Sequence, residues 1–200
     1  MTDPRDIRPA EFPTLSWQPR DVDDSLDALA EWVGGQAAAS IAWYLREKRS
    51  KAACSRFLRI AALSFASIGA AVPFVTAIVD TVALQWGYLG FALAGASMAF
   101  DRFFGFSSAW MRYLLAEMAI QRIVQDMRLQ RTALHAARAG QPATAADIHA
   151  ELTLLSTAAK AVHAEVERET IAWVSEFQSN VAELSALATA PKRRGSAAPE

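Results

Sequence analysis

Two uncharged runs of twenty residues each dominate this sequence, and one charged residue, Asp80, separates run 60–79 from run 81–100. Because an α-helix rises about 1.5 Å per residue, each run matches the ~30 Å hydrocarbon core of a bilayer. The alternative is a buried helix pair in an all-α soluble protein, since Gly, Ala and Ser dilute both runs. Two adjacent uncharged runs of this length are typical of membrane spans, so the sequence favours a membrane hairpin.

The charges around the two runs support that interpretation. Lys and Arg gather before the first run and after the second, whereas the connection offers only Asp80. This asymmetry follows the positive-inside rule and predicts that both termini lie in the cytoplasm. The basic residues are Arg46, Lys48, Arg49, Lys51, Arg56, Arg59, Arg102 and Arg112.

The overall charge, the cysteine count and the N-terminal residues limit the kinds of partner and compartment that we expect. A formal net charge of −1 gives no reason to expect nucleic acid, and the local basic residues suit anionic membrane lipid instead. The single cysteine, Cys54, excludes an internal disulfide and fits a reducing compartment. The N-terminal residues are acidic and Pro-rich without an apolar core, so we expect no signal peptide and insertion through the first span.

Together these patterns predict an all-α membrane protein. Its centre is a two-transmembrane helical hairpin, with an N-terminal helix before it and a C-terminal antiparallel coiled-coil helical hairpin after it. In the N-terminal helical segment we expect Ser25 to cap a helix and Gly34 with Gly35 to interrupt it. The expected parts are a disordered lead 1–24, a cytoplasmic helical segment 25–56, the membrane hairpin 57–106, a cytoplasmic helical hairpin 107–188 and a disordered tail 189–200.

The C-terminal hairpin is predicted from two apolar seams of opposite charge. The first helix is rich in Arg and the second in Glu, which favours antiparallel pairing across the break at 140–142. Thr144 and Asp147 form a capping-box pattern at the start of the second helix. On that second helix we expect Trp173 and Phe177 to belong to the core. The seam of the first helix comprises Tyr113, Ala116, Ile120, Ile123, Met127, Leu134 and Ala137, with Gln130 as its one polar member.

No motif indicates catalysis. The glycines lack the strand-to-helix setting of a phosphate-binding loop. His135, His149 and His163 do not have the spacing of a metal pair on one helix, and no nucleophile has a base beside it in sequence. We therefore expect no enzyme activity, no cofactor and no metal.

Inside the spans, small and polar residues allow two interpretations. They either pack helices closely, as small residues at four-residue spacing do, or line a narrow polar path. These residues are Ser64, Ser67, Ala71, Gln85, Gly90, Gly95 and Ser97. Arg59 and Asp101 are equally far from Asp80, so a turn there predicts an ion pair between the spans. The alternative is that Arg59 snorkels to lipid phosphate while Asp101 bonds Arg102.

Two segments resemble one bacterial family. They are Trp43-Tyr44 before the first span and the stretch that follows the second span. The sequence resembles the SLATT proteins, which are two-transmembrane effectors associated with nucleotide-second-messenger synthases and SLOG sensor domains. The matching residues are Trp43, Tyr44, Asp101, Arg102, Phe103, Gly105, Ser107, Trp110, Arg112 and Tyr113.

The resemblance implies an effector of a bacterial anti-phage conflict system in the inner membrane. Such a protein is expected to form homo-oligomers, open a pore, depolarise the membrane and arrest or kill the cell. The chain carries no recognisable sensor, so the trigger would come from a separately encoded sensor or nucleotide-second-messenger synthase, or bind the helical domain directly. The alternative is a non-permeating membrane scaffold that recruits cytoplasmic partners; a transporter or membrane enzyme has less support, because the spans hold few ionisable groups.

Overall fold

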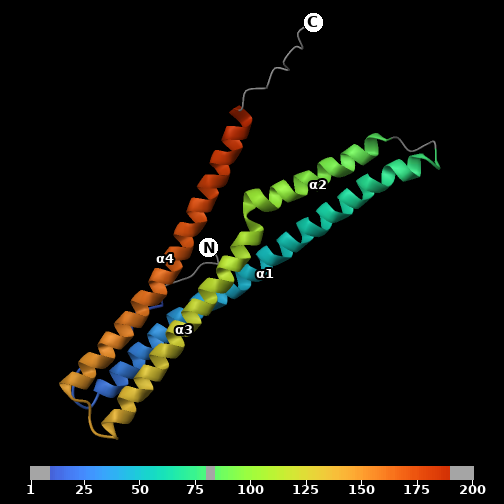
Figure 1. Ribbon diagram of the computed structural model, residues 1–200. Helices are drawn as coiled ribbons and strands as arrows, with labels where there is room; N and C mark the ends of the chain where they lie inside the picture. Colours follow the sequence, from blue (N-terminus) through green and yellow to red (C-terminus); the bar gives the residue numbers. More distant parts are fainter. Residues whose placement is uncertain (1–9, 80–83, 190–200) are drawn as a thin grey trace. The chain divides into compact units, whose positions relative to one another are not determined.

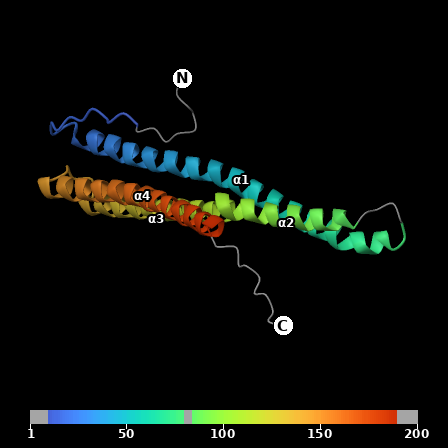
Figure 2. The same cartoon turned by 90° about the horizontal axis from the view of Figure 1, so that it is seen from above.

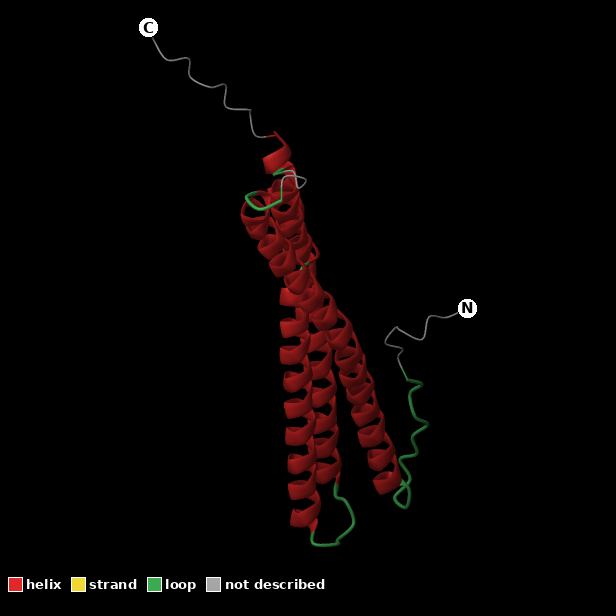
Figure 3. Cartoon of the chain, turned by 90° about the vertical axis from the view of Figure 1, so that its right-hand side faces the viewer, coloured by secondary structure: helices red, strands yellow, loops and turns green. Residues whose placement is uncertain are grey.

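The computed structural model describes residues 10–79 and 84–189, which form helices and no strand (Figures 1 and 3). The helices are α1 (Val22–Thr76), α2 (Gln85–Phe104), α3 (Phe106–Arg138) and α4 (Ala145–Thr189). The chain divides into two compact units, and both α1 and α4 contribute to each. We call residues 1–57 and 106–170 the three-helix unit, and residues 58–105 and 171–200 the hairpin unit.

In the three-helix unit, the first part of α1 packs with α3 and α4 (Figures 1 and 2). One core cluster joins Tyr44 of α1 to Tyr113 and Ile120 of α3 and Val162 of α4. The sequence had predicted a two-helix hairpin here, with the N-terminal helix separate. The structure adds α1 as a third helix, whose small buried residue Ala37 allows close packing.

Ion pairs fix the helix directions in this unit. Arg112, near the start of α3, lies 3.6 Å from Glu169, whereas Arg131 near its end lies 2.6 Å from Glu151. The pairs therefore progress in opposite directions along α3 and α4, which makes the two helices antiparallel. This confirms the antiparallel hairpin predicted from the Arg-rich and Glu-rich helices, and Thr144 caps α4 together with Asp147 as predicted.

The start of α1 differs from the prediction in two respects. Gly34 and Gly35 do not interrupt the helix, because packing of the flanking Val33 and Ala37 outweighs the ~1 kcal/mol that each glycine costs in a helix. Ser25 is not an N-cap. It lies inside the first turns, where its hydroxyl donates to the carbonyl of Ser16 and accepts from the Ser16 N–H.

Part of the N-terminal lead is ordered against α1. Phe12 packs edge-on against Trp32 with ring centroids 5.2 Å apart, and the Trp32 indole donates to the Ala10 carbonyl. Together with the Ser16–Ser25 bonds, these contacts show that the expectation of disorder is wrong for residues 10–21. Residues 1–9 and the tail from 190 lie outside the described residues.

The predicted seam holds for one part of α3 and fails for another. Tyr113, Ala116, Ile120 and Met127 are buried as expected. Gln130 and Ala137 are exposed, because α3 and α4 do not close on each other here and leave an open groove, which Gln130 lines.

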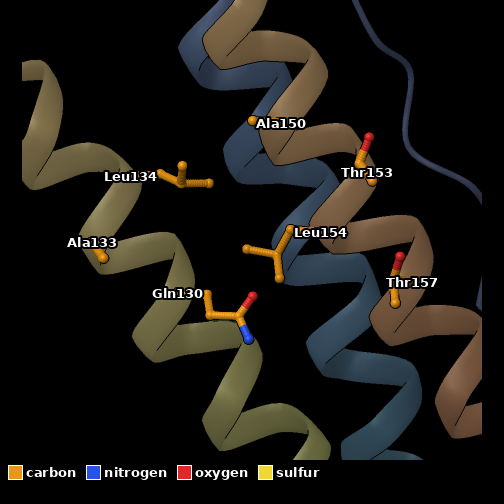
Figure 4. A pocket seen from close by; sticks show the side chains of 7 residues that line it. All are labelled: Gln130, Ala133, Leu134, Ala150, Thr153, Leu154 and Thr157. Carbon is orange, nitrogen blue, oxygen red and sulfur yellow. The ribbon is translucent and has the colours of Figure 1, made fainter.

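That groove encloses about 530 Å³ and is lined from both helices (Figure 4). Leu134 and Gln130 of α3 point toward Leu154 of α4 across it. On α4, Leu155 and Val162 are buried. The prediction that Trp173 and Phe177 belong to a core is wrong, since about half of each side chain is exposed.

Candidate functional site: the helical hairpin of α1 and α2

The apolar end of α1 is the centre of the candidate site. Among the described residues, α1 is the one helix that is long and apolar enough to cross a membrane, with a mean hydropathy of 1.8 over its best window. Only 17 % of that window is buried. Large apolar side chains such as Leu63, Phe74 and Ile78 are at least 70 % exposed. An exposed apolar surface of this size suits lipid rather than water.

The helix α2 lies along α1 in the hairpin unit (Figures 1 and 2). Glycines make the contact between the two helices. A Cβ atom added at Gly90 would lie 2.9 Å from the Phe65 carbonyl oxygen and 3.0 Å from the Gly69 Cα atom. A Cβ atom at Gly69 would lie 2.9 Å from the Gly87 carbonyl oxygen. The backbones therefore touch with no room for a side chain, which is how small residues hold membrane helices together.

Arg59 and Asp101 lie at the other end of this contact. Arg59 Nε is 3.7 Å from Asp101 Oδ2, and the Asp101 side chain is 14 % exposed. Asp101 follows Gly87, Gly90 and Ala94 on one face of α2, because steps of three, four and seven residues return to the same side of a helix. Asp80, from which the pairing was predicted, lies outside the described residues.

The small and polar candidate residues of the spans differ in whether they lie at the contact between α1 and α2. Gly90 is in the contact between the helices, and Ser97 is half-buried with its hydroxyl donating to the Leu93 carbonyl. The others are exposed, and a Cβ atom at Gly95 would meet nothing within 4 Å. The exposed candidates are Ser64, Ser67, Ala71, Gln85 and Gly95.

Four of the residues that carry the family resemblance meet in the three-helix unit. Trp43 and Tyr44 of α1 both contact Tyr113 of α3, with ring centroids 5.7 and 5.6 Å apart. Arg112 lies beside them and pairs with Glu169 of α4. The sequence motifs on either side of the hairpin thus form one aromatic cluster, which joins α1 to α3 within the three-helix unit.

Burial in and beside the aromatic cluster shifts the pKa values of its ionisable side chains. Burial raises the pKa of Tyr44 well above its usual range, and the charges of Glu169 and Glu165 raise it further. Burial likewise raises the pKa of Glu169, against the opposing effect of the Arg112 guanidinium. The tyrosines are therefore neutral near pH 7, and they contribute to the cluster through packing.

The residues after α2 have separate structural roles. Gly105 has a φ of 61°, a left-handed conformation that favours glycine, and its N–H bonds the carbonyls of Arg102 and Asp101 at the end of α2. The Ser107 and Ser55 hydroxyls lie 2.8 Å apart and tie the start of α3 to α1. Phe103 and Trp110 are half-buried.

Sequence reasoning missed the contact of α4 with the end of α2. Arg102 Nη2 donates to both carboxylate oxygens of Glu183 at 3.0 Å. The Asn180 amide donates to the carbonyls of Arg102 and Phe103 at 3.3 Å, where the last carbonyls of a helix lack partners within the helix. The one signal in the sequence was that Asn180 is the single asparagine of the chain.

The described part of the chain offers little for metal chemistry. No group of three or more His, Cys, Asp and Glu side chains there could hold a metal ion. His135 lies 3.1 Å from Glu151, whose carboxylate Arg131 also binds, and His149 lines a different groove. Cys54 is an exposed free thiol.

With this geometry established, the comparison with known families is direct. Residues 6–194 match the family described as "SMODS and SLOG-associating 2TM effector domain 2". The chain therefore belongs to this family of two-transmembrane effector domains. It is therefore an all-α membrane protein with an effector role in conflict systems. Neither a curated protein nor a solved structure matches the chain.

Proposed function

We propose that this chain is the pore-forming effector of an anti-phage system. Copies associate in the bacterial inner membrane with both termini in the cytoplasm, open a path and depolarise the membrane, which arrests or kills the cell. A separately encoded sensor or nucleotide-second-messenger synthase supplies the trigger. Family membership supports the effector role, and the surface of the hairpin supports the association of copies.

One observation carries the proposal. On α1, the face that meets α2 contains Ala62, Gly69 and Val72, which are buried. Ser64 and Ser67 lie on the opposite face and are exposed. At about 100° per residue they are turned away from α2 by roughly half a circle.

A single copy would present these two hydroxyls to hydrocarbon. Small hydroxyl residues commonly lie where another helix approaches, and hydrogen bonds across such interfaces contribute about 0.6–2 kcal/mol. A second copy, or water inside a ring of copies, gives the hydroxyls polar partners. The serine face therefore supports an assembly in which α1 faces a neighbour or a water-filled path.

The test compares ion flux between matched variants. A double variant, Ser64→Leu with Ser67→Leu, should lose most of the dye-reported depolarisation on overproduction and most ion flux from liposomes. The control is Ile68→Leu, which changes a residue on a neighbouring face without adding or removing a polar group. If the double variant inserts normally and conducts like the parent chain, the serine face does not line the path.

Reconstitution must also distinguish conduction by the oligomer alone from conduction that requires a trigger. Liposomes that contain purified oligomer are tested alone and with candidate cyclic nucleotides. Absence of ion flux under every condition would overturn the pore. A reporter fused after Glu200 that is active only outside the membrane should stay inactive if the C-terminus is cytoplasmic.

A non-permeating scaffold is the second candidate. The open groove between α3 and α4 favours it, because an apolar groove of about 530 Å³ in the three-helix unit could hold part of a cytoplasmic partner (Figure 4). A scaffold predicts an unchanged membrane potential on overproduction. Substitution of Leu154 by Asp in the groove would then abolish recruitment without affecting insertion.

A further inference from the structure

The C-terminal part of α4 carries an apolar stripe that the hairpin unit leaves uncovered. Its members recur at steps of three and four residues and therefore lie along one side of the helix. Each side chain is 39–61 % exposed, and the Trp173 and Phe177 rings stack with centroids 5.9 Å apart. The stripe comprises Ile171, Trp173, Val174, Phe177 and Val181.

Contacts inside the hairpin unit place this stripe beside the charged end of α2. Asn180 and Glu183 bind Arg102 and its neighbouring carbonyls. Asn180 lies at the edge of the stripe, seven residues after Trp173, whereas Glu183 is turned away from Phe177 by about 120°. Arg102 follows directly after the uncharged run 81–100 and Asp101, which is where a spanning helix leaves the hydrocarbon. Phe177 precedes Asn180 by three residues, about 4.5 Å of helical rise. Phe177 and Val181, at the C-terminal end of the stripe, therefore lie near the depth of the membrane–water interface, and the rest of the stripe continues from them.

We infer that residues 171–181 form a third membrane contact, in which the apolar stripe of α4 rests on the lipid interface beside α2. Trp and Phe are favoured at this depth, where one part of a ring meets acyl chains and the other meets headgroups. The exposed rings of Phe100 and Phe104 at the end of α2, which stack at 6.0 Å, continue the same kind of surface. This inference depends on the membrane assignment of the family and not on pore formation.

The charges favour lipid as the occupant. Glu183 would be repelled by an anionic leaflet, but its carboxylate is bound at both oxygens by Arg102. Lys192, Arg193 and Arg194 follow shortly after α4 in the sequence. An apolar helix face that is followed in the sequence by a cluster of basic residues is typical of helices that bind the surface of anionic membranes.

The experiment measures lipid and water contact at single positions of the full chain. Cys54→Ser removes the native thiol, and Val174→Cys, Phe177→Cys or Val181→Cys then carries an NBD fluorophore. Ser179→Cys is the matched control, because Ser179 is exposed on the opposite side of the same helix. Each labelled chain is reconstituted in vesicles of phosphatidylethanolamine and phosphatidylglycerol, and circular dichroism checks that it is helical.

Doxyl groups on the lipids should quench the three stripe positions several-fold more strongly than position 179, and aqueous iodide should show the reverse order. Equal access of iodide to all four positions would overturn the inference, since the stripe would then face water. Protection of the stripe from both quenchers would also overturn it, because a second copy or another protein would then cover the stripe. Because the readout is local, a chain that conducts no ions can still give the expected pattern.

Discussion

Arg59 Nε lies 3.7 Å from Asp101 Oδ2, so an ion pair joins the two helices of the hairpin at the end opposite to their connection. Both residues lie on the faces that carry the glycine contact, Gly69 on α1 and Gly90 on α2. The pair and the glycines therefore specify the same facing surfaces. A rotation of either helix would break both contacts at once.

A charge swap tests whether the pair stabilises the membrane hairpin. Arg59→Asp and Asp101→Arg should each reduce insertion or assembly, since an unpaired charge costs about 2.5–3.5 kcal/mol at the bilayer centre and less near its surface. The double swap should recover much of the loss, as measured by membrane fractionation and cross-linking. Strictly additive defects would instead favour snorkelling of Arg59 to lipid phosphate.

The glycine contact predicts opposite effects at two glycines of the same helix. Gly90→Ala places a methyl group against the Phe65 carbonyl and the Gly69 backbone, and overpacking of this kind costs about 1–3 kcal/mol. Gly95→Ala meets open space and should be neutral or slightly stabilising, because alanine favours the helix by about 0.5–1 kcal/mol. Thermal unfolding in mild detergent measures both. Equal melting temperatures would show that the close contact does not form.

A substitution at Gly95 also distinguishes packing within one chain from packing between chains. Because its side is open in one copy, Gly95→Leu should leave the stability of a single chain nearly unchanged. If copies meet at this side, the same variant should shift the protein toward smaller species in size-exclusion chromatography with light scattering. A parent chain that stays monomeric at every concentration in mild detergent would exclude the interface altogether.

Much of this architecture could be predicted because it depends on local pattern. The spacing of Tyr113, Ala116, Ile120 and Met127 gives the buried side of α3 whatever the partner helix is. The pairing of Arg112 with Glu169 follows from two helices of opposite charge joined by a short break. Periodicity and charge are properties of single helices, and the sequence displays both directly.

The features that the sequence could not predict depend on contacts between segments that are distant in the chain. Glu117 and Glu151 are buried because Lys48 and Arg131 reach them from other helices, which no pattern within one helix can indicate. Gly69 was not singled out from the sequence, because its importance comes from the approach of Gly87 and not from its own neighbours. Trp173 and Phe177 have the spacing of a core, yet about half of each side chain is exposed, since spacing alone does not supply a partner helix.

The cap of α4 gives a prediction about pH. Hydrogen bonds from the Thr144 hydroxyl and N–H lower the pKa of Asp147. A carboxylate with a lowered pKa in the folded state stabilises the fold above its ordinary pKa of about 3.9, and loses that effect as the pH falls through the lowered value. Thr144→Ala should therefore reduce the melting temperature more at pH 7 than at pH 3. A pH-independent difference would show that the hydroxyl acts only as a neutral cap.

The last prediction concerns the buried carboxylate of Glu151, which is 2 % exposed. Arg131 donates to it at 2.6 Å and also binds Asp27 of α1, so one guanidinium holds all three helices together. Arg131→Ala would leave Glu151 with the His135 imidazole, 3.1 Å away, as its neighbour in place of a guanidinium. Removal of one partner from a buried ion pair costs about 3–5 kcal/mol, because the other charge stays buried without compensation.

The control for this variant is Arg128→Ala, one turn earlier on α3, where the side chain is exposed. A surface substitution of this kind should change stability by less than about 0.5 kcal/mol. Urea unfolding followed by circular dichroism compares the free energies of unfolding of the two variants. Equal, small effects of both substitutions would mean that Arg131 does not hold the three helices together.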